Sequence, residues 1–194
     1  LGGHVVATCL TAYVEGANRC HLDGFPGAGL RELFGIWNEE LDNLHDETRV
    51  AVRGAIEGTA LDLVERIHLE GAECLAQVGS EFYSGQAVIT ENSYGNGMAS
   101  YLAARFEMPA LLSFYARLIE KAHLGRSIEV DLPEGVIFRC RDSAEGRVAF
   151  LFNYNRVPQM IEMGEQSFVD FMDSKKVYSG SFELKPYESL ILRV

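Results

Sequence analysis

The stretch 37–40, WNEE, places an amide beside two carboxyl groups, residue types that cleave glycosidic bonds in many enzymes. In such sites the asparagine holds a substrate hydroxyl and the glutamate protonates the leaving oxygen. The reaction also needs a second carboxylate at a fixed separation, with both groups on a rigid scaffold such as eight βα units. The pattern of this chain falls far short of eight units. We therefore interpret 37–40, with the acidic residues up to Glu47, as an exposed acidic edge.

Cys9 follows an apolar run, the position at which amidotransferase-like α/β proteins carry a nucleophilic cysteine. Such a nucleophile lies on a strained turn flanked by small residues and needs a histidine base nearby. The flanking residues here are Thr8 and Leu10, and no later histidine has a suggestive local setting. The sequence therefore predicts a structural thiol at Cys9.

Gly95 and Gly97 form a Gly-x-Gly pattern, which occurs in phosphate-binding loops and in tight hairpins. A phosphate loop places its glycines between a strand and a helix N-terminus. The residues after Gly97 have a strand-like pattern, and neither a third glycine nor a Gly-Lys-Ser/Thr ending is present. We predict a hairpin with Asn96-Gly97 as its two-residue turn.

Aromatic residues recur in the last third of the chain. An aromatic face could stack on sugar rings, but alternation with a period of two is also what a β-core requires. We predict that these residues belong to a core. They are Phe150, Phe152, Tyr154, Tyr178, Phe182 and Tyr187.

The chain has 194 residues, a formal net charge of −11 and a pI near 4.9. This acidity argues against nucleic acid and anionic membrane partners, which are bound mainly by Lys and Arg. No apolar run approaches the roughly 20 residues of a membrane span, so we expect a cytoplasmic location. The four cysteines form no CxxC pair and no cluster with histidine, which predicts reduced, mostly packing thiols, no metal site and no cofactor.

Residues 1–125 have a mixed α/β pattern. The apolar run 4–13 predicts a strand buried on both faces, and Pro26 and Gly35 bracket a predicted short helix. Shorter strands are predicted at residues 66–69, 73–78, 87–91 and 98–105. A clear helix follows, beginning near Pro109 and ending at Gly125. Its single predicted apolar face contains Leu111, Phe114, Tyr115, Leu118, Ile119 and Ala122.

Residues 126–194 change to a period of two. Short strands are predicted from residue 127 onward, separated by Pro, Gly, Asn and Ser, with no helical stretch between them. We therefore place a domain boundary near residues 123–126. The second domain is predicted to be a small antiparallel β-sandwich.

Several segments of the chain are characteristic when taken together. They include HVVATCLTAYV, HLDGFPGAGLRELFGIWNEELDNL and the later Tyr-Gly-x-Gly turn at 94–97. These segments resemble the trimerisation domain of glycoside hydrolase family 42, the bacterial β-galactosidases. LPEGVIFRCRDSAEGRVAFLFNYN and LKPYESLILRV are similar to the C-terminal β-domain. The resemblance covers nearly the whole chain, and the segments occur in the family's order.

The resemblance implies a partial flavodoxin-like domain, of the class I glutamine amidotransferase type, over 1–125, and a β-sandwich over 126–194. The family's catalytic acid/base and nucleophile lie on a separate (β/α)₈ barrel, so no residue here inherits a catalytic role. The implied function is non-catalytic assembly of a homotrimeric, retaining β-galactosidase. We expect Phe25 and Trp37 to contribute to self-association, because aromatic residues are enriched in interface cores.

Two other classes of function remain open from the sequence. A carbohydrate-binding accessory module would use exposed aromatic residues of 126–194. An amidotransferase-like α/β protein would use a reactive Cys9.

Overall fold

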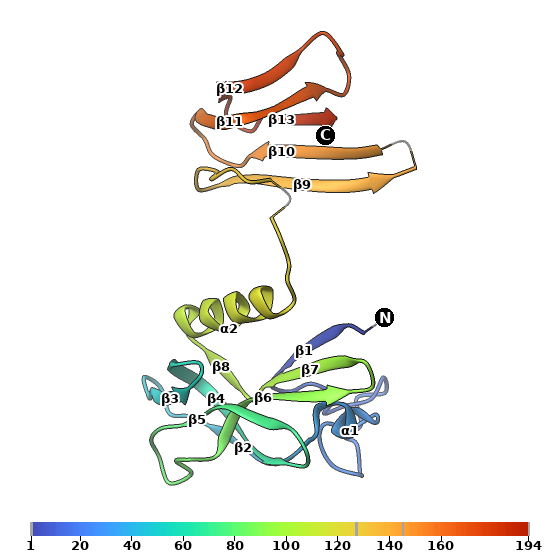
Figure 1. Ribbon diagram of the computed structural model, residues 1–194. Coiled ribbons are helices and arrows are strands. Elements are labelled where there is room, and N and C mark those ends of the chain that lie inside the picture. The colour runs from blue at the N-terminus through green and yellow to red at the C-terminus, as the bar shows by residue number, and fades with distance from the viewer. Residues whose placement is uncertain (1, 127, 145, 194) are drawn as a thin grey trace. The chain divides into compact units, whose positions relative to one another are not determined.

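The computed structural model describes residues 2–126, 128–144 and 146–193, and the chain divides into two compact units, Leu1–Leu124 and Gly125–Val194. Residues 127 and 194 are the first and last residues of the region in which the sequence predicts short strands, and both lie outside the described residues. The first unit contains, in chain order, β1 (His4–Thr8), α1 (Leu30–Phe34), β2 (Ile36–Asn43), β3 (Val50–Gly54), β4 (Gly58–Leu69), β5 (Glu73–Val78), β6 (Ala87–Tyr94), β7 (Gly97–Leu102), β8 (Ala104–Phe106) and α2 (Met108–Lys121) (Figure 1).

The strands of the first unit form one mixed sheet in the order β1-β7-β6-β5-β3-β4-β2, with β8 paired to β4. Within the described residues, β1 and β7 are the parallel pair and the other neighbours are antiparallel. The unit therefore consists mostly of strands. It is a mixed sheet with few helices, and so has fewer helices than the predicted α/β class implies. The physical reason is the short connections between β3, β4 and β5, which can join antiparallel strands but leave no room for crossover helices.

Strand β1 is shorter and more exposed than predicted for residues 4–13. It ends at Thr8, and Val5 retains 49% of its accessible surface. The chain turns immediately afterwards, since Leu10 and Ala12 have φ angles of 67° and 54°. Such left-handed conformations cannot continue a strand.

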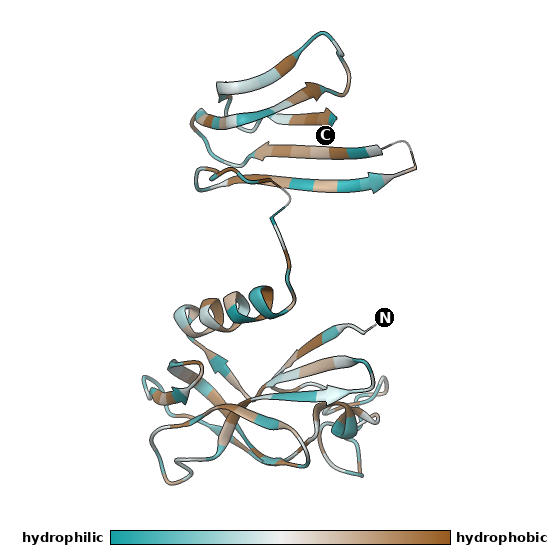
Figure 2. Ribbon diagram, in the orientation of Figure 1, coloured by the Kyte–Doolittle hydropathy of each residue, from teal (hydrophilic) through white to brown (hydrophobic). Residues whose placement is uncertain are grey.

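Both predicted helices are present, and the predicted start is more accurate for α2 than for α1. Helix α2 begins at Met108 with Pro109 in its first turn, as predicted, but it ends at Lys121 and not at Gly125. Apolar and polar segments alternate along it in Figure 2. Helix α1 begins at Leu30, four residues after Pro26, and ends before Gly35, whose φ of 60° provides the left-handed C-cap. Pro26 therefore precedes the helix and does not start it.

Helix α2 approaches the sheet very closely at one point. A Cβ placed on Gly58, the first residue of β4, would lie 2.7 Å from the Cβ of Ala110, and Gly58 has a φ of +156°. Ala110 and Phe114 are the buried residues of the helix. The absence of a side chain at Gly58 thus permits α2 to pack against β4.

The β6–β7 hairpin confirms the predicted role of the glycine pair but not its detailed geometry. Tyr94 pairs with Gly97, so the turn consists of Gly95 and Asn96, one residue earlier than predicted. Gly95 has a φ of 55°. Gly97 is favoured by close packing. A Cβ at this position would lie 2.6 Å from the carbonyl oxygen of Gly3.

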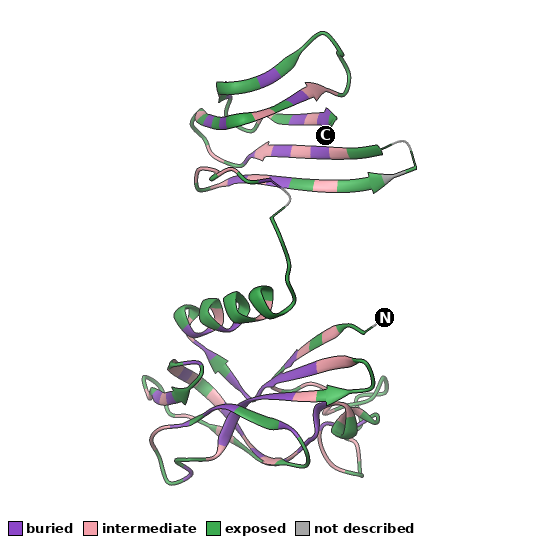
Figure 3. Cartoon of the chain, in the orientation of Figure 1, coloured by how far each residue is buried: buried purple, intermediate pink, exposed green. Residues whose placement is uncertain are grey.

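The second unit is all-β and antiparallel, as predicted at that coarser level. Its strands are hydrogen-bonded in the order β12-β11-β13-β10-β9. Alternate side chains form a separate apolar core, visible as buried bands along the strands in Figure 3. The strands are β9 (Val136–Ser143), β10 (Gly146–Asn153), β11 (Gln159–Asp170), β12 (Val177–Leu184) and β13 (Ser189–Arg193).

The prediction that the aromatic residues of the second unit belong to its core is correct for Tyr178 and Phe182 and wrong for the others. Ala149 and Leu151 of β10 are fully buried, so the alternating Phe150 and Phe152 lie on the opposite, half-exposed face. Their rings are parallel within 5° at a centroid distance of 6.3 Å. Tyr154 and Tyr187 are more than 60% exposed.

Candidate functional site

Asn38 is a structural anchor, which corrects its assignment to an exposed edge. Its side chain is buried, its backbone N–H donates to the carbonyl of Phe25 at 2.8 Å, and its Nδ2 donates to the Tyr13 hydroxyl at 2.6 Å. These bonds attach the long loop after β1 to strand β2.

Glu39 and Glu40 are exposed, as the acidic-edge interpretation predicts, but both are paired with groups of β4. The Glu39 carboxylate lies 2.7 Å from His68 Nε2, and the Glu40 carboxylate accepts from Arg66 at 2.5 Å. The hydrogen bond from His68 lowers the pKa of Glu39, with a smaller contribution from Arg66. A carboxyl held in its ionised form this way is poorly suited to donate a proton.

A buried polar cluster lies where β1 and β7 end, and it consists of Cys9, Tyr13, Asn38, Glu65 and Tyr101. Glu65, in β4, is 1% exposed, and its Oε1 accepts the Leu10 N–H at 2.7 Å. Its Oε2 and the Tyr101 hydroxyl are also buried, and neither has a partner in good hydrogen-bonding geometry among the described residues. We call this set the Glu65 cluster.

Burial controls the electrostatics of the Glu65 cluster. Desolvation raises the pKa of Glu65, and the Leu10 N–H and the nearby Tyr101 and Tyr13 hydroxyls offset only part of this effect. Desolvation, followed by the charge of Glu65, raises the pKa values of Tyr101 and Tyr13. A carboxyl this deeply buried cannot contact a substrate, so the cluster fastens the Leu10 turn to the sheet.

Cys9 is half-buried beside Glu65, and burial raises the pKa of its thiol from 9.0 to about 11. Because the thiolate is the nucleophile, we expect Cys9 to react with a disulfide reagent at pH 7.5 about a hundredfold more slowly than a thiol with a pKa near 9. Stopped-flow labelling should show a fast phase from the exposed Cys20 and a slow one from Cys9. Single Cys→Ser variants assign each phase. Labelling of Cys9 as fast as Cys20 would contradict the expectation and favour a reactive nucleophile.

The two exposed cysteines correct the prediction that the thiols are mostly packing residues. Cys20 lies in the loop after β1 and Cys74 in β5, and both are exposed, whereas Cys9 and Cys140 are half-buried. Periodicity could not have shown this, because Cys74 lies within a strand whose Leu75 and Ala76 are buried.

Phe25 and Trp37, the predicted self-association residues, are half-buried and already have aromatic or cationic neighbours. The Phe25 ring stacks on Tyr13 at 4.2 Å, and the Trp37 ring stacks on His68 at 4.5 Å. Arg31 lies 5.8 Å from the centre of the Trp37 ring. Both aromatic residues are therefore rigidly held, a property of good interface anchors.

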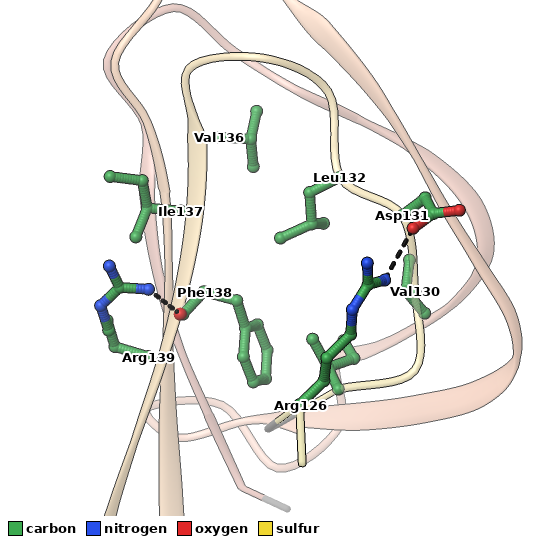
Figure 4. A pocket seen from close by; sticks show the side chains of 9 residues that line it. Arg126, Val130, Asp131, Leu132, Val136, Ile137, Phe138 and Arg139 are labelled. Atoms are coloured by element: carbon green, nitrogen blue, oxygen red, sulfur yellow. Dashed lines mark hydrogen bonds and ion pairs between the residues drawn. The ribbon is translucent and has the colours of Figure 1, made fainter. Parts of the chain in front are cut away.

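One hollow in each unit contains acidic side chains. In the second unit a pocket of about 420 Å³ has both apolar and charged lining residues, and its carboxylate, Asp131, accepts a hydrogen bond from Arg126 at 2.7 Å (Figure 4). In the first unit a polar hollow of about 400 Å³ contains Glu73 and Glu91, but Glu91 forms an ion pair with Lys121. Neither arrangement, among the described residues, leaves one free acid beside one free base.

The described ranges contain no group of three or more His, Cys, Asp or Glu side chains placed to hold a metal ion. The helices described there are all too short or too polar to cross a membrane.

Comparison with known proteins identifies both units. A family model for the β-galactosidase trimerisation domain matches residues 1–125, and one for the β-galactosidase C-terminal domain matches residues 135–194. The two units thus correspond to the trimerisation and C-terminal parts of a glycosidase. The chain belongs to the family 42 β-galactosidases.

Individual relatives give the same result. The chain is 35% identical to β-galactosidase Pbg of Clostridium perfringens, over 99% of this chain and 29% of that protein. It is 36% identical to β-galactosidase BglY of Alicyclobacillus acidocaldarius, over 86% of this chain and 25% of that protein. It is similar to the crystal structure of the β-galactosidase from Bacillus circulans sp. alkalophilus, with a TM-score of 0.83 and 28% identity, over 100% of this chain and 29% of that one. It is also similar to the crystal structure of the β-galactosidase from Rahnella sp. R3, with a TM-score of 0.80 and 36% identity, over 98% of this chain and 28% of that one. The chain therefore spans under a third of the length of these relatives.

The Glu65 cluster was not anticipated from the sequence, apart from Cys9 and Asn38. The one available signal is that Glu65 interrupts the strand LDLVERIHL at a position where its neighbour Val64 is also buried. An acidic residue in an apolar strand indicates a buried polar contact.

Proposed function

We propose that this chain is the non-catalytic C-terminal assembly region of a longer β-galactosidase. The observation that carries the proposal is the match of nearly the whole chain to two domains of these enzymes other than the catalytic one, over about 29% of a relative's length. The two hollows described above support it, because neither combines a free general acid with a free nucleophile or base. The proposed role is to hold copies of the enzyme together.

The proposed parent protein hydrolyses terminal β-D-galactosides by a retaining, two-carboxylate mechanism on a separate (β/α)₈ barrel. We propose a homotrimer in the cytoplasm, in which a neighbouring subunit helps to form the wall of the galactose pocket. Assembly by this region would then affect catalysis without contributing a catalytic residue.

Activity measurement tests the proposal directly. The purified 194-residue chain is expected to leave a chromogenic β-galactoside intact, whereas the C. perfringens relative hydrolyses it under the same conditions. Adding the chain to a trace of that relative controls for inhibitors in the preparation. Hydrolysis by the isolated chain at a rate within tenfold of the relative's would refute the proposal.

We also propose that the first unit is the later part of a flavodoxin-like domain. In the described residues β1 is paired with β7 on one side and has no strand on the other. Parallel strands are normally covered on both edges and faces. Further parallel strands beside β1 would complete such a sheet.

Phe25 and Trp37 are proposed to contribute to self-association. The double variant F25A/W37A is expected to lower the weight-average molar mass of the chain in light scattering, because interface anchors account for most of the binding free energy. The control is Phe82→Ala, which removes a different aromatic ring of the first unit, one that is 81% exposed. An unchanged molar mass for F25A/W37A would remove both residues from the interface.

Carbohydrate binding by the second unit is a second candidate function. It is favoured by one observation, the half-exposed parallel rings of Phe150 and Phe152 on the face away from the core. Titration of the chain with galactobiose, followed by NMR, should then shift signals of β10, and F150A/F152A should abolish the shifts. A flat titration would remove this candidate.

A further inference from the structure

Residues 9–29, between β1 and α1, form a long loop that has hydrogen bonds of its own. The Gly27 N–H donates to the Ala12 carbonyl at 3.0 Å, and the His21 N–H donates to the Tyr13 carbonyl at 3.2 Å. A loop with internal bonds can keep much of its shape when it leaves the surface beneath it. We call this segment the β1–α1 loop.

Two buried residues of the sheet hold the β1–α1 loop in place. Glu65 of β4 accepts the Leu10 N–H at 2.7 Å. Asn38 of β2 donates to the Tyr13 hydroxyl through its side chain at 2.6 Å and to the Phe25 carbonyl through its backbone at 2.8 Å. The asparagine amide is uncharged at every pH, so Glu65 is the titratable one of these two attachments.

The groups that face Glu65 do not balance a negative charge. Cys9 and Tyr13 face it from the loop and Tyr101 faces it from β7, and burial raises the pKa values of all three above their ordinary range, so that they are neutral near pH 7. Asn38 faces it from β2 and is also neutral. One carboxylate oxygen of Glu65 is buried without a partner in good geometry among the described residues. An ionised Glu65 is therefore poorly solvated while the loop is closed.

The nearest charged groups on record do not change this balance. Arg105 of β8 and Asp62 of β4 influence the charge of Cys9 in opposite directions, and they form an ion pair with each other at 2.8 Å. None of the ion pairs between described residues includes Glu65. The carboxyl thus has hydrogen-bond donors beside it but no paired cation.

Closure of the loop is coupled to protonation of Glu65. Burial is the largest influence on the pKa of Glu65 and raises it above 4.5, and the Leu10 N–H offsets only part of this effect. When the loop opens, the carboxyl meets water and recovers its ordinary pKa. The stabilisation of the closed loop is therefore fully present below pH 4.5 and is lost as the pH rises through the closed-state pKa.

We propose that Glu65 is a pH-sensitive latch, which holds the β1–α1 loop on the sheet in acid and releases it more often as the pH rises. The strands remain paired when the loop opens. Opening uncovers the Asn38 N–H, because its acceptor, the Phe25 carbonyl, belongs to the loop. The Glu65 N–H stays covered, because it donates to the Ala103 carbonyl at 2.7 Å, outside the loop. The latch is a property of the single chain and does not depend on its assembly.

Amide hydrogen exchange of the 194-residue chain, followed by NMR, tests the latch. After correction for the intrinsic pH dependence of exchange, the protection factor of the Asn38 amide is expected to fall at least tenfold between about pH 5 and pH 8. Its exchange should be insensitive to low concentrations of urea, because a local opening exposes little surface. The Glu65 amide should exchange more slowly and with a clear dependence on urea, as expected for global unfolding.

Two matched variants identify the titrating group. Glu65→Gln keeps the acceptor for Leu10 and removes the charge, so the protection of the Asn38 amide at pH 8 should be at least tenfold higher than in the wild type and nearly constant with pH. Glu73→Gln makes the same change at an exposed position of β5 and should retain the wild-type profile.

Three results would overturn the latch. The first is an Asn38 protection factor that does not change with pH in the wild type. The second is the same fall in Glu65→Gln as in the wild type, which would assign the titration to another group. The third is a shared urea dependence of the Asn38 and Glu65 amides, because the loop would then open only when the whole unit unfolds. The first and third results are read from the wild type alone.

Discussion

Glu65→Gln is expected to raise the free energy of unfolding at pH 8 by about 2 kcal/mol, because it replaces a buried carboxylate that lacks a full set of partners. The Gln carbonyl can still accept the Leu10 N–H at the position of Oε1, which lies 2.7 Å from that nitrogen in the wild type. Its amide group then faces Tyr101, whose hydroxyl is buried without a partner in good geometry among the described residues. The substitution keeps the shape of the side chain and removes its charge.

The benefit of Glu65→Gln should depend on pH in a defined direction. The pKa of Glu65 is raised by burial above its ordinary value of 4.5. The stabilisation associated with the protonated carboxyl is therefore fully present below pH 4.5 and is lost as the pH rises through the folded-state pKa. The difference between variant and wild type should be largest near pH 8 and should shrink as the pH approaches 4.5.

Urea unfolding of both proteins at several pH values measures this difference while cancelling the contribution of other carboxylates. Glu65→Ala is the matched comparison, and it should lower the free energy of unfolding by about 3 kcal/mol, because it leaves a cavity and an unpaired Leu10 N–H. Opposite effects of Gln and Ala would establish that the charge, and not the hydrogen bond, is unfavourable. A destabilised Glu65→Gln variant at pH 8 would show that the ionised carboxyl is needed.

Gly58→Ala is expected to lower the free energy of unfolding by about 3 kcal/mol, through overpacking against α2 and backbone strain. The added Cβ would lie 2.7 Å from the Cβ of Ala110, and the φ of +156° is unfavourable for alanine. Because both partners are attached to regular elements, relief requires a shift of the helix or of β4.

Ala110→Gly provides the matched control for this contact. Alone it should cost about 1 kcal/mol, from the helix propensity of glycine. In G58A/A110G the steric conflict is removed, so the double variant should be more stable than the sum of the single effects predicts, by at least about 1 kcal/mol. Additive effects would show that strain at residue 58, and not contact with α2, limits this position.

The sequence predicts helices and strands well where one segment contains the whole signal. Helix α2 is an example, since its period and Pro109 are local features, and strand β5 has the predicted bounds, Glu73–Val78. Strand β1 is a counterexample. The apolar run continues to Tyr13, but the chain leaves the sheet after Thr8 because Leu10 turns and is bonded to Glu65, 55 residues later.

The candidate site shows the same limit. Asn38 and Cys9 are visible as chemically notable residues, but no local pattern connects them with Tyr13, Glu65 and Tyr101. Their proximity follows from the pairing of β2 with β4 and the ending of β1 and β7 at the same place. Pairings over such distances are set by long-range packing.

By itself the sequence determined the family, the start of the α2 helix and the change from a mixed to an all-antiparallel unit. These properties depend on composition, on short motifs in order and on local periodicity, all of which are contained in the chain itself. The tertiary structure alone decided which side of each periodic element is covered. It placed Phe150 and Phe152 outside the core, buried Glu65 and left Tyr115 and Ile119 of α2 exposed, because burial depends on which neighbours the sheet brings to each face.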